Sequence, residues 1–337
     1  MQRKVYKLKA GRISNLTLID DQLDAPEAHE VQIQVQAFGL NFADLFAIWG
    51  LYDATPKGPF TPGLEYAGFV TEVGSAVQSV AKGDRIMGIT KFGGYANALN
   101  IDHRYVVPMP PDWDFEDGAS FLVQVLTAYY ALVTLGNIQP NYHVLIHSGA
   151  GGVGILANRL AKANGAYTIG TTSSEAKVAF MKADGYDQVL VRTNNFKTEL
   201  AQLLDDRPLN LILECIGGRI LKEGFELLAP EGRMVVYGSA HFASPGDRPN
   251  YLTLIWNYLR RPKIDPLILP KTNRSLMGFN LIWLYDEVQK MHAILQALQQ
   301  YDLGKPYVGQ TFPMENLHEA LKLFQSGKTM GKVVIIT

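Results

Sequence analysis

The sequence predicts an α/β protein in which a β-rich domain is joined to a domain built on a doubly wound parallel sheet. Three observations predict this fold. The apolar residues 144–146 lead into a glycine-rich turn that opens a helical pattern. From this turn to about residue 281, short apolar runs alternate with helical stretches, which is typical of a parallel sheet with helices on both faces. The preceding residues, 1 to about 122, contain strand-like runs separated by turns.

The first segment is predicted to be mostly β-structure. Residues 31–37 alternate strictly between apolar and polar side chains, so one face of this strand should be buried and the other should face water. Strand-like runs at residues 66–73 and 86–89 each follow a turn that contains glycine. A proline-rich connector comes next, and the helical pattern of residues 121–135 then carries the chain into the second domain.

The second domain contains six apolar runs that we predict to be its strands. They are residues 144–147, 167–171, 188–191, 211–215, 234–237 and 276–279. An amphipathic helix at residues 288–298 and a final strand at residues 331–336 follow them. We therefore predict a β-rich domain of residues 1–122 and 282–337, and a parallel-sheet domain of residues 123–281.

The composition excludes several classes of protein. The chain has 337 residues, which is long enough for about two domains. With 47% hydrophobic residues and a net charge of −1, it has the composition of a soluble globular enzyme and lacks the basic excess of a nucleic-acid-binding protein. No apolar run is expected to approach the ~20 residues of a membrane span. The single cysteine, Cys215, excludes an internal disulfide, and a cytoplasmic location is the simplest expectation.

The glycine-rich turn predicts a dinucleotide-binding site. Gly149, Gly151 and Gly154 match the pattern G-x-G-x-x-G between a strand and a helix. In this pattern the first glycine allows a tight turn, the second lets the backbone approach a pyrophosphate, and the third lets the helix pack against the strand. The helix N-terminus then favours a negative charge. The predicted cofactor-binding residues of this turn are Gly149, Ala150, Gly151, Gly152, Val153 and Gly154.

The end of the second predicted strand indicates NADP(H) rather than NAD(H). An NAD-dependent enzyme carries Asp or Glu there to accept a hydrogen bond from the ribose 2′-hydroxyl. This strand is followed instead by Ser173 and Ser174, whose small hydroxyl side chains can admit and bind a 2′-phosphate. Lys177, one helical turn later, and Arg192, at the end of the third strand, supply positive charge. An ordinary solvated lysine is the alternative for Lys177.

Further cofactor contacts follow from the topology, because the loops after the carboxyl ends of parallel strands surround the ligand. This rule selects Ile216 and Gly217 after the fourth strand, and Gly238 and Ser239 after the fifth. His147, after the first strand, is more simply explained as a histidine satisfied by the local backbone than as a catalytic base. Cys215 is expected to be a small buried residue rather than a nucleophile.

Five motifs carry a resemblance to a known family. They are Gly39-Leu40-Asn41-Phe42-Ala43-Asp44, Thr61-Pro62-Gly63-Leu64-Glu65, Lys82-Gly83-Asp84-Arg85, Gly149 to Gly154, and Gly331-Lys332-Val333-Val334. Together with the order of the domains, they resemble the medium-chain dehydrogenase/reductase superfamily over nearly the whole chain. The resemblance implies a GroES-like catalytic domain, completed by the C-terminal segment, and a Rossmann NADP-binding domain. It also implies a homodimer formed through the edge strand of the Rossmann sheet, here from Leu276 to Phe279.

Within this superfamily the chain resembles the zinc-free quinone oxidoreductase branch. The zinc branch has a cysteine in the first motif and Gly-His-Glu in the second, where this chain has Leu40-Asn41 and Gly63-Leu64-Glu65. A site without thiolate and imidazole ligands does not hold a tetrahedral zinc ion, so no metal is expected and Glu65 is expected to be structural. The run Asn41 to Leu45, followed by Gly50-Leu51-Tyr52-Asp53, is similar to the vesicle amine transport protein 1 homologues within this branch.

A zinc-free site suits the reduction of a quinone or an α,β-unsaturated carbonyl, because hydride addition leaves a delocalised anion that a hydrogen-bond donor can stabilise. Tyr52 is the candidate donor, and a tyrosine on a loop without a role in the chemistry is the alternative. Asn41 is expected beside the nicotinamide. Asp44 either orients its neighbours or serves as a helix N-terminal carboxylate. Thr127 is a cofactor-side candidate, with simple packing as its alternative.

The resemblance also implies that Phe279 and Lys332 lie towards the nicotinamide. The sequence thus predicts an NADPH-dependent, zinc-independent reductase of quinones or α,β-unsaturated carbonyls, acting on a small molecule and not on nucleic acid.

One segment has two interpretations. The residues from Tyr251 to Leu259 are largely apolar, and Arg260, Arg261 and Lys263 follow them. The first interpretation is a packed helix or lid beside the dimer edge and the active site. The second is a peripheral lipid contact from Tyr251 to Lys263, because apolar and aromatic residues beside basic ones suit interfacial binding. It supports an alternative function, a nucleotide-binding, membrane- or lipid-associated protein of the vesicle amine transport type with little turnover.

Overall fold

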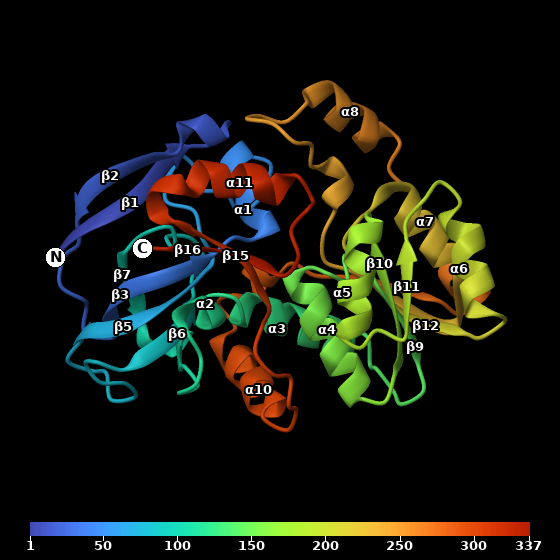
Figure 1. The fold of residues 1–337 in the computed structure, drawn as a ribbon, viewed down its shortest axis with the longest axis horizontal. Coiled ribbons are helices and arrows are strands. Elements are labelled where there is room, and N and C mark those ends of the chain that lie inside the picture. Colours follow the sequence, from blue (N-terminus) through green and yellow to red (C-terminus); the bar gives the residue numbers. More distant parts are fainter.

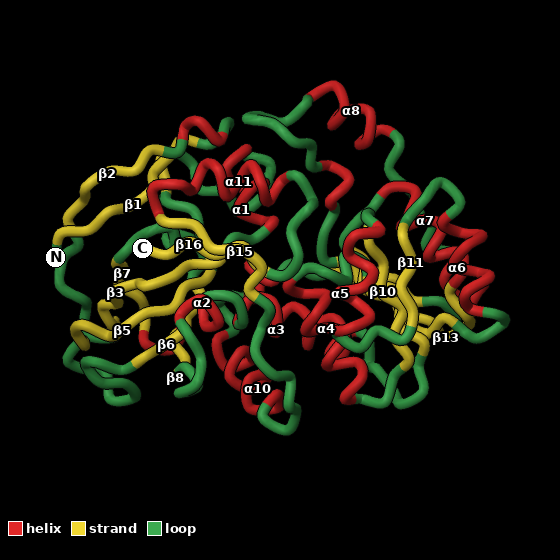
Figure 2. Tube along the Cα trace, in the orientation of Figure 1, coloured by secondary structure: helices red, strands yellow, loops and turns green.

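Two groups of strands lie side by side in the computed structural model, which describes residues 1–337 (Figure 1). One group is a parallel sheet with its helices, and the other is mostly antiparallel. Figure 2 shows the strands of both groups in yellow and the helices that separate and surround them in red. The prediction of an α/β protein with a β-rich part and a doubly wound part is confirmed.

The parallel sheet has six strands in the order β11-β10-β9-β12-β13-β14. The strands are β9 (His143–Ile146), β10 (Tyr167–Thr172), β11 (Gln188–Val191), β12 (Leu209–Glu214), β13 (Leu228–Val236) and β14 (Ser275–Gly278). The helices that connect the first five are α4 (Gly152–Ala163), α5 (Val178–Ala183), α6 (Phe196–Leu204) and α7 (Gly218–Leu227). Chain order reverses between β9 and β12, so the loops after these two strands border one crevice.

The apolar face of α4 packs against the parallel sheet. Leu156, Ala157, Leu160 and Ala161 are buried, as their helical spacing predicts. Val153, which the same spacing placed on this face, is only partly buried and lines a cavity instead. The first turn of α4 therefore faces the space in which a ligand would sit.

The β-rich part contains two sheets. In the larger, β15-β16-β3-β5-β6-β8 are neighbours and β7 also pairs with β3; the smaller has the order β2-β1-β4. The strands are β1 (Gln2–Lys9), β2 (Thr17–Gln22), β3 (Glu30–Gly39), β4 (Pro59–Phe60), β5 (Glu65–Val73), β6 (Arg85–Ile89), β7 (Ala98–Asp102), β8 (Val106–Pro108), β15 (Val308–Pro313) and β16 (Lys332–Ile336). Because β16 pairs antiparallel with β3, the C-terminal segment completes the N-terminal sheet, as expected.

The polar face of β3 is less exposed than its alternation predicts, since Gln34 and Gln36 are only partly exposed. Gln32 is only 3% exposed. Its Nε2 donates to the backbone oxygen of Asp24 (3.1 Å) and to Oδ1 of Asn100 (3.2 Å), and Gln34 Nε2 donates to the backbone oxygen of Asn97 (2.9 Å). Since β7 and its neighbouring residues lie against β3, these amides satisfy buried backbone groups rather than meet solvent.

The helical segment between the two parts is longer than its apolar pattern indicates. It comprises α2 (Phe115–Gly118), α3 (Leu122–Tyr129) and a π-helical turn (Tyr130–Leu135). By length and composition alone, residues 115–135 are sufficient to cross a membrane, so the expectation that no apolar run approaches this length is wrong. In the structure, 61% of the segment's apolar window is buried inside the protein, as in the core helix of a globular domain.

The long connection between β13 and β14 carries two short helices, α8 (Tyr251–Leu259) and α9 (Ile268–Thr272). Neither contains a buried residue, and α8 lies at the outer margin of the molecule (Figure 1, top). The side chains of α8 are therefore largely exposed in a single chain, and its role as a packed helix or lid beside the dimer edge stays a prediction. After β14, which is the edge strand of the parallel sheet as predicted, α10 (Val288–Leu298) leads back to the β-rich part. α11 (Leu317–Gln325) then precedes β16.

We propose that the β-rich domain comprises residues 1–122 and 282–337, and that the parallel-sheet domain comprises residues 123–281.

Candidate active site

A cavity of about 490 Å³ lies between the parallel sheet and the β-rich part. The glycine-rich turn and the loops after β10, β12 and β13 form one end of it. The start of α1 (Phe42–Trp49), the buried helix α3 and the segment from β14 to α10 form the other end. One continuous space thus reaches both the predicted nucleotide site and the residues proposed for chemistry.

The glycine-rich turn has no room for side chains at its first and third glycines. A Cβ on Gly149 would lie 2.4 Å from Cε of Met181, and one on Gly154 would lie 2.5 Å from the backbone oxygen of Ser148. Gly151 is more open, since its Cβ would meet only that same oxygen at 3.2 Å. The sequence predicts that Gly149 allows the tight turn, but the residue with a positive φ is Ser148, at 53°. Close packing, rather than a left-handed backbone, accounts for Gly149.

The adenosine end of the cavity contains two cations and no acidic residue. Ser173, Lys177 and Arg192 line it, whereas Ser174 lies outside the lining. The ion pairs of the chain include neither Lys177 nor Arg192. Burial and, secondarily, the neighbouring Arg192 lower the pKa of Lys177. Two unpaired cations that repel each other form a site that an anionic group would stabilise.

Lys177 also links the two parts of the chain. Its Nζ donates to the backbone oxygens of Gly327 (2.6 Å) and Thr329 (2.7 Å), in the loop before β16. The alternative of an ordinary solvated lysine is therefore wrong, because the side chain is anchored and faces the cavity.

The loops after β12 and β13 reach the cavity unequally. Ile216, Gly238 and Ser239 line it, but Gly217 does not. The backbone N–H of Gly217 donates to Oε1 of Glu214 at 2.7 Å, and its φ is 84°. Gly217 therefore shapes the loop rather than contacting the cavity.

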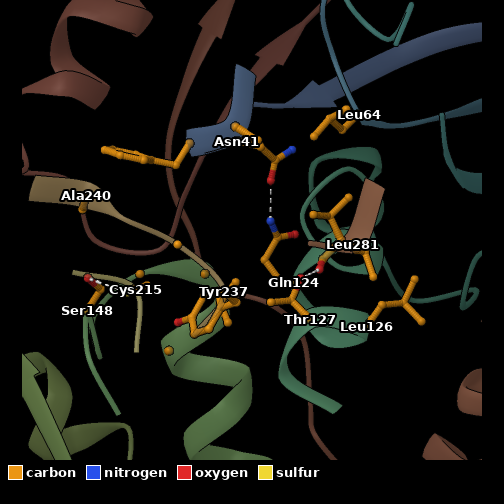
Figure 3. Close-up of a pocket in the computed structure, with 18 of the residues that line it drawn as sticks. Asn41, Leu64, Gln124, Leu126, Thr127, Ser148, Cys215, Tyr237, Ala240 and Leu281 are labelled. Carbon is orange, nitrogen blue, oxygen red and sulfur yellow. Dashed lines mark hydrogen bonds between the residues drawn. The ribbon is translucent and has the colours of Figure 1, made fainter. Parts of the chain in front are cut away.

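A buried hydrogen-bond network forms the floor at the opposite end. Lys332 Nζ donates to the backbone oxygen of Leu40 (2.7 Å), to Oδ1 of Asn41 (3.0 Å) and to Oε1 of Glu65 (2.7 Å). Asn41 Nδ2 donates to Glu65 Oε1 at 3.0 Å, and Gln124 Nε2 donates to Asn41 Oδ1 at 2.8 Å (Figure 3). Lys332 and Glu65 are 4% and 0% exposed. The network fixes Asn41 at the cavity wall, and it shows Glu65 in the structural role expected for it.

Gln124 leaves one polar atom of this network free. Its Oε1 is buried, has no hydrogen-bond partner, and belongs to a residue that lines the cavity. A buried acceptor without a partner costs free energy unless a ligand donates to it. An amide N–H of a bound carboxamide is such a donor.

Asp44 lies behind this floor and not in the cavity. Its Oδ2 accepts hydrogen bonds from the backbone N–H of Asn41 (2.8 Å) and from the hydroxyl of Tyr95 (2.9 Å). Burial raises the pKa of Asp44 to about 7, although these hydrogen bonds oppose the shift. Its position agrees with both roles predicted for it, because it caps the N-terminus of α1 and holds Asn41 and Tyr95.

Tyr52 enters the cavity from the loop after α1. Its hydroxyl donates to Oδ1 of Asn280 at 2.7 Å, so the two side chains form a pair at the cavity surface. Burial is the main reason why the pKa of Tyr52 is raised to about 12. The phenol therefore stays protonated at neutral pH, and it can act as a hydrogen-bond donor but not as a phenolate.

The remaining wall around this pair is mostly apolar, although Thr90, Tyr285, Glu287 and Lys290 also line the cavity. Leu64, Leu126, Leu281, Ile282, Leu284, Met291 and Ile294 line it (Figure 3 labels the first three). Thr127 also lines the cavity, but its hydroxyl donates to the backbone oxygen of Val123 at 2.6 Å and can only accept from a ligand. Phe279 lies against Tyr130, with ring centroids 4.8 Å apart. The region suits a flat, largely apolar molecule that carries oxygen atoms.

Comparisons with known proteins agree with this arrangement. Residues 27–111 match the alcohol dehydrogenase GroES-like domain family, and residues 152–295 match the zinc-binding dehydrogenase family. The human synaptic vesicle membrane protein VAT-1 homolog is 32% identical over 316 residues, which cover 93% of this chain and 80% of that protein. The chain belongs to the medium-chain dehydrogenase/reductase superfamily.

Two further members of the superfamily are similar in sequence or structure. The quinone oxidoreductase of Lama guanicoe is 30% identical over 323 residues, covering 94% of this chain and 92% of that protein. The structure of Escherichia coli quinone oxidoreductase complexed with NADPH has a TM-score of 0.85 and 25% identity, and the match covers 99% of this chain and 100% of that one. These similarities bear out the resemblance to the quinone oxidoreductase branch.

Although one superfamily domain is described as zinc-binding, the residues present do not fit a zinc ion. No group of three or more His, Cys, Asp or Glu side chains in the chain could hold a metal. Leu64 stands where the second motif would supply a histidine, and the nearby Glu65 carboxylate is already bonded to Lys332 and Asn41. A buried ion pair therefore occupies this part of the site, with no donor set for a metal.

Two other side chains at strand ends have no role in the cavity chemistry. His147 is 0% exposed, and its Nδ1 bonds to the side chain of Thr171 rather than to the local backbone as predicted, while its Nε2 lies 3.2 Å from Oε2 of Glu214 without a hydrogen bond. Cys215 does line the cavity, where its Sγ donates to Oγ of Ser148 at 3.5 Å (Figure 3). Burial raises the pKa of this thiol, so it is a poor nucleophile.

Sequence reasoning missed Asn280 and Gln124. Asn280 follows β14, and the rule that loops at the carboxyl ends of parallel strands bind the ligand would have selected it. Gln124 is a polar residue within the apolar helix α3, which is an available but weak signal. Their partners, Tyr52 and Asn41, come from distant parts of the chain and could not be read from either segment alone.

Proposed function

We propose that this protein is an NADPH-dependent, zinc-independent reductase that transfers a hydride to quinones or α,β-unsaturated carbonyls. The observation that carries the proposal is the cavity itself. It joins a glycine-rich, cationic nucleotide end to an apolar end that presents neutral hydrogen-bond donors and no metal-ligand set. The quinone oxidoreductases among the relatives support the substrate class.

The residues of the cavity fit NADP(H) as the cofactor. Gly149 and Gly154 keep the turn free of side chains at the N-terminus of α4, where a pyrophosphate would be favoured. Lys177 and Arg192 supply positive charge for a 2′-phosphate, and Gln124 Oε1 offers a buried acceptor at the other end. When bound, the reduced nicotinamide supplies the hydride.

The substrate end stabilises charge without a metal or a free cation. All three N–H groups of Lys332 Nζ are bonded within the chain, so this ammonium acts through Asn41 and Glu65 rather than on the substrate. The Tyr52–Asn280 pair supplies neutral hydrogen-bond donors at the apolar end. When Tyr52 donates to a substrate oxygen, it must leave Oδ1 of Asn280; alternatively, the Asn280 amide donates in its place. Either donor suits a delocalised phenolate or enolate, which is a milder anion than an alkoxide.

A panel of quinones and enones with NADPH tests the proposal. Oxidation of NADPH should be followed at 340 nm, with the products identified by mass spectrometry. We expect turnover with at least one quinone or conjugated ketone, and none when simple primary alcohols are supplied with NADP⁺. Turnover of alcohols but not of quinones or enones would contradict the proposal.

The exposed helix α8 favours a second candidate function. Leu252 is 82% exposed and Leu259 is 68% exposed. The guanidinium of Arg260 lies 3.8 Å from the centroid of the Trp256 ring, so basic and aromatic groups share one surface. We propose a peripheral lipid contact from Tyr251 to Lys263, which agrees with the membrane protein named among the relatives.

Sedimentation with liposomes tests lipid binding at this surface. Sedimentation with liposomes containing phosphatidylserine should bring down the wild-type protein but not Leu252→Asp. If the Leu252→Asp variant sediments with liposomes as well as the wild type does, α8 is not the contact.

We also propose a homodimer through the edge strand β14, which sedimentation velocity without lipid would detect.

A further inference from the structure

A chain of buried polar side chains crosses the carboxyl ends of four neighbouring strands of the parallel sheet. Glu214 ends β12, His147 follows β9, Thr171 lies at the end of β10, and Arg192 follows β11. Glu214 Oε2 lies 3.2 Å from Nε2 of His147, and His147 Nδ1 lies 2.7 Å from Oγ1 of Thr171. Arg192 Nη1 donates to that same Oγ1 at 2.8 Å. Glu214, His147 and Thr171 are each 0% exposed, so nothing but protein surrounds them.

The hydrogen bonds from Arg192 to Thr171 and between Thr171 and His147 determine where the hydrogens of these side chains lie. Because Thr171 Oγ1 accepts from Arg192, its own hydrogen is available for Nδ1 of His147. We assign the proton of His147 to Nε2, which lies 3.2 Å from Oε2 of Glu214 without a hydrogen bond between the two atoms. Burial alone would raise the pKa of Glu214, but His147 and the backbone N–H groups of Ile216 and Gly217 hold it below its usual value. The carboxylate therefore anchors one end of the chain.

Of these four side chains, only that of Arg192 reaches the cavity. Within the protein its guanidinium makes a hydrogen bond to Thr171 and no ion pair, so its other N–H groups remain for a ligand. An arginine side chain loses considerable rotamer freedom when it binds an anion, and a hydrogen bond made beforehand reduces that loss. The buried side chains thus hold a ligand-binding cation without touching the ligand.

We propose that Thr171, His147 and Glu214 are positioning residues that fix Arg192 toward the 2′-phosphate of NADP(H). The inference rests on the cofactor assigned in the proposed function. It gives a role to a histidine and a carboxylate that lie outside the cavity, and it predicts that they influence the choice between a phosphorylated and an unphosphorylated ribose.

Binding of 2′,5′-ADP and of 5′-AMP, measured by isothermal titration calorimetry, tests this role without any turnover. Thr171→Val removes the hydroxyl and keeps the shape, whereas Thr171→Ser keeps the hydroxyl. We expect Thr171→Val to weaken 2′,5′-ADP about two- to tenfold, which is the cost of ordering one long side chain. The affinity for 5′-AMP should change less than about twofold, and Thr171→Ser should retain the wild-type affinity for 2′,5′-ADP.

Two more variants separate positioning from a general effect on the fold. Glu214→Gln places an amide opposite Nε2 of His147, and the side chains of His147 and Thr171 lie between it and Arg192. This variant should weaken the binding of 2′,5′-ADP selectively. Thr168→Val is the matched control, because Thr168 is also buried in β10 but its hydroxyl is directed to Asp187 (3.3 Å). It should change neither affinity.

This test is independent of the proposed reductase activity, because the affinities for 2′,5′-ADP and 5′-AMP can be measured whether or not the protein turns over a substrate. A selective loss of 2′,5′-ADP binding in Thr171→Val and Glu214→Gln supports the inference. Equal losses for both ligands, unchanged binding in Thr171→Val, or a wild-type protein that binds the two ligands equally would each overturn it.

Discussion

The buried Lys332–Glu65 pair gives the sharpest stability prediction. The two side chains are 4% and 0% exposed and their charged atoms lie 2.7 Å apart. Lys332→Met removes the ammonium and leaves the carboxylate with only Asn41 Nδ2 (3.0 Å) and the backbone N–H of Val123 (3.2 Å) as donors. Removing one partner of a buried pair typically costs about 3–5 kcal/mol, because the remaining charge is uncompensated.

The free energy of unfolding should be measured by urea denaturation at pH 7. Adding Glu65→Gln to Lys332→Met removes the orphaned charge, so the double variant should recover at least half of the loss. Lys197→Met serves as the control, since Lys197 and Glu226 form an ion pair at 2.6 Å with side chains 48% and 39% exposed. Breaking such a surface pair should cost about 0–1 kcal/mol. If Lys332→Met costs no more than this control, the pair is not the buried anchor that its geometry indicates.

Four further predictions follow from the site. Tyr52→Phe should lower kcat for the best quinone by less than the ~10²–10³ fold typical of a lost oxyanion donor, with little change in NADPH affinity; an unchanged kcat would remove Tyr52 from the mechanism. NADPH should exceed NADH at least about tenfold in kcat/KM, and Lys177→Ala should erode this ratio; equal use of both cofactors contradicts the assignment. Because Leu64 replaces a metal ligand, activity should survive EDTA and elemental analysis should find no stoichiometric zinc, whereas activity lost to EDTA and restored by zinc refutes this. The pKa of Asp44 is about 7 in the fold against a usual 3.8, so the folded state retains a proton that the unfolded state has lost; the free energy of unfolding should fall between about pH 4 and 7, and Asp44→Asn should remove that part of the slope.

The sequence by itself determined the fold and the nucleotide end of the site. The apolar run before Gly149 and the helical spacing after it are local patterns, and the strand and helix they predict are present as β9 and α4. The absence of an acid at the end of β10 and the leucine at position 64 are likewise visible in short stretches of sequence. Such features depend on neighbouring residues, and local propensity and periodicity are sufficient to predict them.

The tertiary structure alone decided how the polar side chains are paired. Lys332 meets Glu65 across 267 positions of sequence, and Tyr52 meets Asn280 across 228. It also assigned Asp44 to a helix end behind the cavity and His147 to a chain that leads to Arg192. A buried polar group must find a hydrogen-bond partner, but which partner it finds depends on the elements that the fold brings together, and no local pattern records that choice.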